Sequence, residues 1–213
     1  MAQRPQKKKD KKNVCVFCGS SPGRDPAYAK AASALGTAIG AEGWGLIFGG
    51  GDIGLMGKVA EAAYHSGASV KGIMPLFLRH LEPPLKHGEV LEFTPDLQTR
   101  KGQMLAEADA FIILPGGLGT LDEFFEVVTS AQLSVFAKPI VVLNTKNYFA
   151  PLRALMRHIV RQGFARPSTA KLVTFVATPK AAMKAITRPV ESSARAASLR
   201  PRSAKVRPKR SRT

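Results

Sequence analysis

The chain has 213 residues, 45% of them hydrophobic, which allows one domain of ordinary size with a full core. Its formal net charge is +17, concentrated at the ends: residues 1–12 carry +5, residues 188–213 carry +8, and residues 13–187 carry only +4. Neither end holds an apolar segment typical of a signal peptide or a membrane helix, so we expect a cytoplasmic protein without membrane contact.

Both terminal segments are poor in large apolar residues and rich in Lys, Arg, Ser and Pro. We therefore predict that residues 1–12 and 188–213 are disordered basic tails on either side of one domain, residues 13–187. A basic tail can contact nucleic acid weakly and non-specifically, or it can serve as a solubilising extension. The sequence leaves both alternatives open.

Strands and helices alternate throughout the predicted domain, which is typical of a single doubly wound, mostly parallel Rossmann-like α/β sheet with helices on both faces. Short apolar runs predict strands at 13–18, 45–48, 69–74, 90–93, 110–114, 139–143 and 172–176. Amphipathic segments predict helices at 26–42, 55–66, 97–107, 120–133, 148–161 and 180–186, and the proline-rich segment 75–88 predicts a loop.

The two cysteines, Cys15 and Cys18, form a C-x-x-C, a spacing used in redox centres and in half of a zinc site. Both fall in the first predicted strand, where a separation of three residues points the side chains to opposite faces. No second cysteine pair is present, and the four histidines show no ligand spacing. We therefore expect two buried small residues and no metal site.

Three glycine-bearing loops follow predicted strands, at the sheet edge where ligands of such folds bind. Glycines let backbone N–H groups approach a ligand, and the helix that follows the third loop adds partial positive charge, a combination suited to phosphate. The candidate phosphate-binding residues are Ser20, Gly49, Gly50, Gly51, Gly116, Gly117, Gly119 and Thr120.

The second loop reads G-x-G-x-x-G over residues 49–54, a pattern shared with dinucleotide-binding proteins. A dinucleotide site also needs an acidic residue about 20 positions later, and residues 69–74 contain none. A P-loop is excluded, because Asp52 and Val59 occupy positions that require Gly and Ser or Thr. A mononucleotide phosphate loop fits better.

Thr120 and Glu123 have the spacing of a capping box, with Thr120 as the predicted N-cap of its helix. A functional interpretation places the Glu123 carboxylate one turn from the phosphate site, where it could stabilise positive charge on a sugar ring or orient a water. Arg100 belongs either to a solvated face or to the mouth of the same cleft, where it could bind a phosphate or assist a leaving base. The residues alone leave these alternatives open.

Together these residues resemble the LOG ("lonely guy") family of cytokinin riboside 5′-monophosphate phosphoribohydrolases. The family's P-G-G-x-G-T-x-x-E appears whole at residues 115–123. The similarity continues in Cys15–Ser21, in Gly49–Gly51 with Gly54–Gly57, and in Arg100-Lys101, and it covers roughly residues 13–187.

The resemblance implies hydrolysis of the N-glycosidic bond of an N6-substituted adenosine 5′-monophosphate, without cofactor, in a homodimer. It implies that Arg100 and Glu123 are the catalytic pair, and that Lys101 and Met104 join the glycine loops in binding substrate. This chain has Leu97-Gln98 and Ser130 where relatives usually have Met-His and Trp, so prenylated and plain adenine both remain candidate bases. The alternatives are a general purine nucleotide nucleosidase and a non-catalytic protein of the same fold that binds nucleotides or nucleic acid.

Overall fold

A computed structural model describes residues 11–80, 83 and 90–188. Nearly all of the two predicted tails lies outside the described residues, so the prediction that residues 1–12 and 188–213 are disordered stays a prediction. Within the described ranges, no helix has the length and apolar character needed to cross a membrane.

The described residues form one sheet of seven strands, in the order β4-β3-β2-β1-β5-β6-β7, and every neighbouring pair is parallel. Each strand begins and ends within one residue of its predicted bounds. The strands are β1 (Asn13–Phe17), β2 (Gly45–Phe48), β3 (Val70–Pro75), β4 (Val90–Thr94), β5 (Ala110–Ile113), β6 (Ile140–Leu143) and β7 (Val173–Val176).

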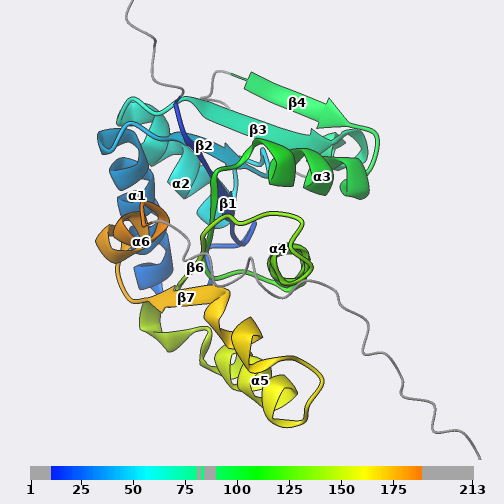
Figure 1. Ribbon diagram of the computed structural model, residues 1–213. Coiled ribbons are helices and arrows are strands. Elements are labelled where there is room, and N and C mark those ends of the chain that lie inside the picture. The colour runs from blue at the N-terminus through cyan, green and yellow to red at the C-terminus, as the bar shows by residue number, and fades with distance from the viewer. Residues whose placement is uncertain (1–10, 81–82, 84–89, 189–213) are drawn as a thin grey trace, which may run out of the picture.

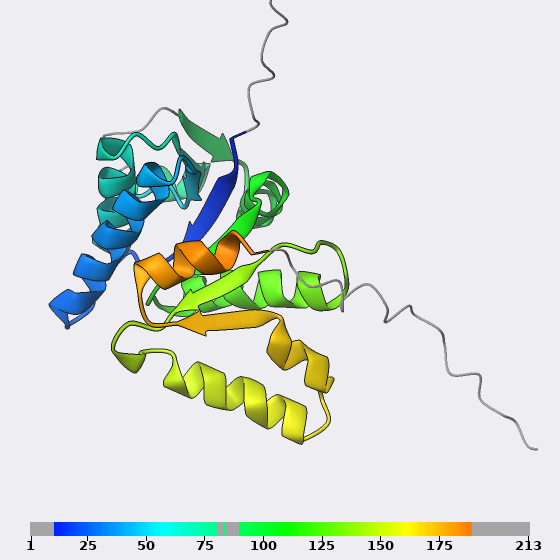
Figure 2. The same ribbon diagram turned by 60° about the vertical axis from the view of Figure 1, so that its left-hand side comes forward.

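Helices cover both faces of the sheet, as the sequence predicts (Figures 1 and 2). One face carries α1 (Pro26–Ala41), α2 (Gly54–His65) and α6 (Pro179–Ile186), and the other carries α3 (Leu97–Glu107), α4 (Leu118–Gln132) and α5 (Ala150–Arg161). The structure adds three short 3₁₀ helices that the sequence did not predict: η1 (Leu76–His80), η2 (Thr145–Asn147) and η3 (Pro167–Lys171).

The central strands are apolar along their whole length because helices bury both faces of a parallel sheet. Along β1, Val14 and Val16 contact the core under α1 and α2, whereas Cys15 and Phe17 contact the core under α4. Cys18 lies in the first of these clusters, so the two cysteines occupy opposite faces, and both are free and buried. The prediction that both cysteines are buried, with their side chains on opposite faces, is confirmed.

The sheet has its topological switch point between β1 and β5. After β1 the chain builds the sheet outward through β2, β3 and β4, and then returns to β5 on the other side of β1. The helices that follow these two strands, α1 and α4, lie on opposite faces, so the loops diverge and leave a crevice at the carboxyl ends. A backbone bond of 3.0 Å from Gly19 N–H to the Pro115 carbonyl oxygen joins the two loops at this point.

Candidate active site

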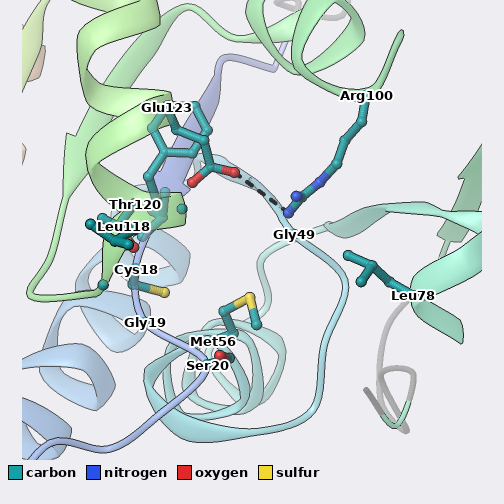
Figure 3. A pocket seen from close by; sticks show the side chains of 14 residues that line it. Cys18, Gly19, Ser20, Gly49, Met56, Leu78, Arg100, Leu118, Thr120 and Glu123 are labelled. Carbon is teal, nitrogen blue, oxygen red and sulfur yellow. Dashed lines mark ion pairs between the residues drawn. The ribbon is translucent and has the colours of Figure 1, made fainter. Parts of the chain in front are cut away.

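A cavity of about 250 Å³ opens at this crevice, and all three glycine-bearing loops contribute to its wall (Figure 3). Polar groups and apolar side chains share the lining, which suits a ligand with both a charged and an aromatic part. The lining residues include four glycines, Gly19, Gly49, Gly117 and Gly119, and four residues with polar side chains, Ser20, Arg100, Thr120 and Glu123.

Arg100 and Glu123 extend toward one another across this cavity from α3 and α4 (Figure 3). Arg100 Nη2 lies 3.5 Å from Glu123 Oε1, and the two side chains are only 12% and 11% exposed. Removing either partner would leave the other as a buried charge with weakened compensation, which is strongly unfavourable. The structure thus brings together the two residues that the sequence singled out.

The Arg100 guanidinium is fixed from two further directions. Its Nε–H donates a 3.0 Å hydrogen bond to the carbonyl oxygen of Ile73 in β3. Nη2 lies against the backbone of Gly49, so closely that a Cβ at that position would overlap it. Gly49 is therefore required for its lack of a side chain, and the arginine has little freedom to turn away from the cavity.

The N-terminus of α4 differs from the sequence prediction in a way that matters for the site. The prediction of a capping box with Thr120 as N-cap is wrong: the helix begins at Leu118, and its N-cap is Gly117, which provides no side-chain hydrogen bond. The first N–H groups of a helix have no partner within the helix, and the N-cap Gly117 has no side chain that could cap them. They give the cavity an anion-binding wall with the positive end of the helix dipole behind it.

Thr120 and Tyr148 hold the preceding turn in place. Thr120 is buried inside the first turn of α4, with its hydroxyl packed against Gly116. The Tyr148 hydroxyl donates a 2.6 Å hydrogen bond to the Gly116 carbonyl oxygen. Tyr148 follows two residues with left-handed backbone, Lys146 (φ 54°) and Asn147 (φ 60°). Such backbone strain persists where the surrounding structure enforces it. Here it lies directly before Tyr148, the side chain that contacts the glycine turn at Gly116.

The other candidate residues divide into two groups. Ser20, Gly49, Gly117, Gly119 and Thr120 line the cavity. Three further glycines do not line it. Gly50 has φ +83° and packs on Gly72, Gly116 lies beneath Thr120, and Gly51 is buried.

Lys101 and Met104, which the family resemblance implies as substrate-binding residues, also lie away from the cavity lining. Lys101 Nζ contacts Asp122 Oδ2 and Glu126 Oε2, each at 3.1 Å, and so joins α3 to α4. Burial lowers the pKa of this lysine, but hydrogen bonds to Glu126 and Asp122 outweigh it and raise the pKa above its usual value. Met104 is fully buried in the core under α4.

Seven lining residues were not among the predicted site residues: Val16, Phe17, Cys18, Gly19, Met56, Leu78 and Leu118. Burial, followed by the nearby negative charge of Glu123, raises the pKa of the Cys18 thiol well above its ordinary value, which keeps it protonated at neutral pH. Met56 belongs to the Gly54–Gly57 segment that the family resemblance already included, so this motif could have indicated it. The described residues contain no group of three or more His, Cys, Asp or Glu side chains arranged to hold a metal ion.

Comparison with known proteins identifies consistent relatives. A family model described as "Possible lysine decarboxylase" matches residues 56–186. The cytokinin riboside 5′-monophosphate phosphoribohydrolase of Rhodococcoides fascians is 40% identical over 84% of this chain and 90% of its own length. The enzyme of the same name, LOG7, from Arabidopsis thaliana is 40% identical over 80% of this chain and 77% of its own. The probable cytokinin riboside 5′-monophosphate phosphoribohydrolase LOGL2 of Oryza sativa subsp. japonica is 40% identical over 79% of this chain and 69% of its own length.

Solved structures share the fold at lower sequence identity. The molybdenum cofactor binding protein of Rippkaea orientalis superposes with a TM-score of 0.66 at 22% identity, covering 83% of this chain and 96% of that one. A molybdenum cofactor carrier protein of Chlamydomonas reinhardtii gives a TM-score of 0.64 at 19% identity with the same coverage. At these identities the likeness extends to the fold alone.

Proposed function

The chain belongs to the LOG family of cytokinin riboside 5′-monophosphate phosphoribohydrolases, and we propose that it hydrolyses the N-glycosidic bond of N6-substituted adenosine 5′-monophosphates. The products are the free base and ribose 5-phosphate. The observation that carries the proposal is the buried Arg100–Glu123 pair, which faces the same cavity as the N-terminus of α4.

Each part of this arrangement has a role in breaking a glycosidic bond. The backbone N–H groups at the start of α4 bind the 5′-phosphate and thereby fix the ribose. Departure of the base leaves an oxocarbenium-like sugar, whose positive charge the Glu123 carboxylate stabilises while it orients the attacking water. Arg100 stabilises the negative charge that develops on the leaving base. Since both charged groups are held before substrate binds, little reorganisation is needed in the transition state.

The three positions at which the chain departs from the usual family sequence lie outside this arrangement. Leu97, Gln98 and Ser130 do not line the cavity, whereas Arg100 and Glu123 do. The substitutions therefore leave the proposed catalytic pair in place, and the assay below distinguishes a prenylated from a plain adenine as the preferred base.

Release of free base measured by chromatography tests the proposal. Isopentenyladenosine monophosphate and AMP are compared side by side, with the wild-type chain and with Glu123→Gln, which keeps the shape of the side chain and removes its charge. We expect release from the prenylated nucleotide, reduced about 100-fold or more in the variant. Glu126→Gln is the matched control, because it removes a carboxylate on the same helix outside the cavity lining.

Two other outcomes would redirect the proposal. Release from AMP alone would make the protein a general purine nucleotide nucleosidase. Undiminished binding of AMP with no release from either nucleotide would favour a non-catalytic nucleotide-binding protein.

We also propose a homodimer with the cavity near its interface, in the cytoplasm. Leu118 lines the cavity and is nevertheless 86% exposed, and Phe125 on the same helix is 37% exposed. A second copy packed over this end of α4 would bury both side chains. Size-exclusion chromatography with light scattering would give the mass of the protein in solution. A monomer at the concentrations used in the activity assay would contradict this proposal.

A further inference from the structure

The small net charge of the domain hides an uneven distribution along the chain. Residues 13–126 carry −5 and residues 127–187 carry +9. No Asp or Glu occurs between Glu126 and Glu191, although ten Lys and Arg residues occur between 127 and 188. The basic character that the sequence locates in the tails therefore also belongs to the last third of the folded domain.

Much of this charge lies on α5, which flanks β7 at one edge of the sheet in both ribbon views (Figures 1 and 2). Leu152 and Met156, four residues apart, are buried and attach the helix to the core. Arg153, Arg157 and Arg161 repeat with the same spacing, so they share one side of the helix, and all three are exposed.

These arginines have no ion-pair partner among the described residues, whereas the half-buried Lys71 and Lys101 each contact two carboxylates. Like charges four residues apart on a helix destabilise it slightly. Arg153 does have a fixed position, since its guanidinium lies over the Phe175 ring at 5.5 Å from the centroid. A guanidinium stacked in this way still directs its N–H groups outward for a bidentate contact with phosphate.

An exposed aromatic ring accompanies the arginines. Phe164 is 88% exposed and falls between Arg161 and Arg166, which is itself exposed at the start of η3. Arginines that contact phosphates beside a ring on which a base can stack are the combination used to bind single-stranded nucleic acid.

We propose that Arg153, Arg157, Arg161, Arg166 and Phe164, hereafter the α5 surface, bind the backbone and one base of single-stranded nucleic acid. A membrane is the weaker alternative, because an interfacial helix inserts its apolar face into the lipid, and the apolar face of α5 is buried in the core through Leu152 and Met156. The segment that follows α6 suits the same partner, since residues 189–213 contain eight Lys and Arg and one Glu.

Fluorescence anisotropy with a labelled single-stranded oligonucleotide, over a series of NaCl concentrations, tests the proposal on the full chain. The test variant carries Arg153→Gln, Arg157→Gln and Arg161→Gln. The matched control carries Arg24→Gln, Lys30→Gln and Lys58→Gln, which removes the same charge from exposed positions in the acidic part of the domain. Both chains keep the tails, so the comparison isolates the α5 surface.

We expect the test variant to bind more weakly than the control, and the slope of log affinity against log salt to fall in magnitude by about 2, as the loss of three phosphate contacts to a single strand requires. Phe164→Ala should weaken binding about fivefold or more without changing the slope, and Phe164→Tyr should restore it. Leu155→Ala, which removes another exposed apolar side chain of α5, should have no effect. Base release from nucleotides should be unchanged in every one of these variants.

Equal weakening in the test variant and the control would overturn the proposal, because it would show that net charge alone drives binding. Absence of binding at low salt would overturn it as well. Phosphatidylserine vesicles are added as competitor: a vesicle affinity that exceeds the oligonucleotide affinity and is lost in the same variants would assign the α5 surface to a membrane instead.

Discussion

Adding one methyl group at Gly49 tests how much the reaction depends on the position of Arg100. The Cβ of Gly49→Ala would overlap Nη2 of Arg100 and would lie 3.0 Å from Sδ of Met56. The guanidinium must then retreat by about 1 Å, because its Nε–H bond to the Ile73 carbonyl oxygen keeps it from swinging elsewhere. A displacement of about 1 Å costs roughly 100-fold in rate, equivalent to about 2.7 kcal/mol of transition-state stabilisation.

The same substitution should leave the folded state almost unchanged. The backbone at Gly49 is outside the left-handed region, so alanine introduces no strain there. We expect base release from isopentenyladenosine monophosphate to fall about 100-fold in kcat/KM, while the melting temperature shifts by less than about 4 °C.

Gly102→Ala provides the matched control, since it adds the same methyl group on α3, two residues from Arg100, where nothing lies within 4 Å. It should retain activity and gain up to about 1 kcal/mol of stability from helix propensity. If Gly49→Ala retained the activity of Gly102→Ala, the fixed position of Arg100 would have no catalytic importance and our account of the site would be wrong.

Three further predictions follow from contacts around the cavity. Tyr148→Phe removes the 2.6 Å hydrogen bond to the Gly116 carbonyl oxygen, so KM should rise about 2- to 10-fold with little change in kcat, measured by steady-state kinetics. Lys101→Met breaks the contact between α3 and α4 and should cost about 1–2 kcal/mol in denaturant unfolding with KM unchanged, whereas a large rise in KM would show that this lysine binds substrate. Burial raises the pKa of both thiols, Cys15 and Cys18, in the folded state. Their contribution to stability is therefore complete below the pKa of an unfolded thiol, about 8.5. Above that pH the free energy of unfolding should fall by up to about 1.4 kcal/mol per pH unit for each thiol. Thermal melts at alkaline pH check this against a variant with both cysteines replaced by Ala.

The sequence predicted the sheet well because its strands are buried on both faces. A strand such as Ala110–Ile113 must be apolar at every position, and the Pro115-Gly116 turn shortly after it limits its length. For Arg100 and Glu123 the local pattern left a structural and a functional interpretation open, and the family resemblance implied that they form a pair. The structure brings the two side chains to 3.5 Å.

The features that the sequence missed depend on contacts between distant segments. The capping-box pattern of Thr120 and Glu123 is correct in spacing, yet Gly117 takes the N-cap position and the buried glutamate points into the cavity. No local pattern marks Tyr148 as the partner of a glycine turn 32 residues earlier. The position of Lys101 beside Arg100 in the chain suggested that it also binds substrate. Its side-chain partners lie on another helix, however, and Lys101 joins α3 to α4.

The geometry of the Arg100–Glu123 pair depends on two backbone groups that contact the guanidinium. A charge-assisted contact between guanidinium and carboxylate normally closes to about 2.7–2.9 Å, and such a contact would neutralise much of the carboxylate's charge. Here the Ile73 carbonyl oxygen and the backbone of Gly49 fix the guanidinium, and the separation stays at 3.5 Å. The buried carboxylate is thus held at the cavity with its field directed at the position where the sugar becomes positive. A site built in this way depends on glycine at one position and on a carbonyl at another, neither of which takes part in the chemistry.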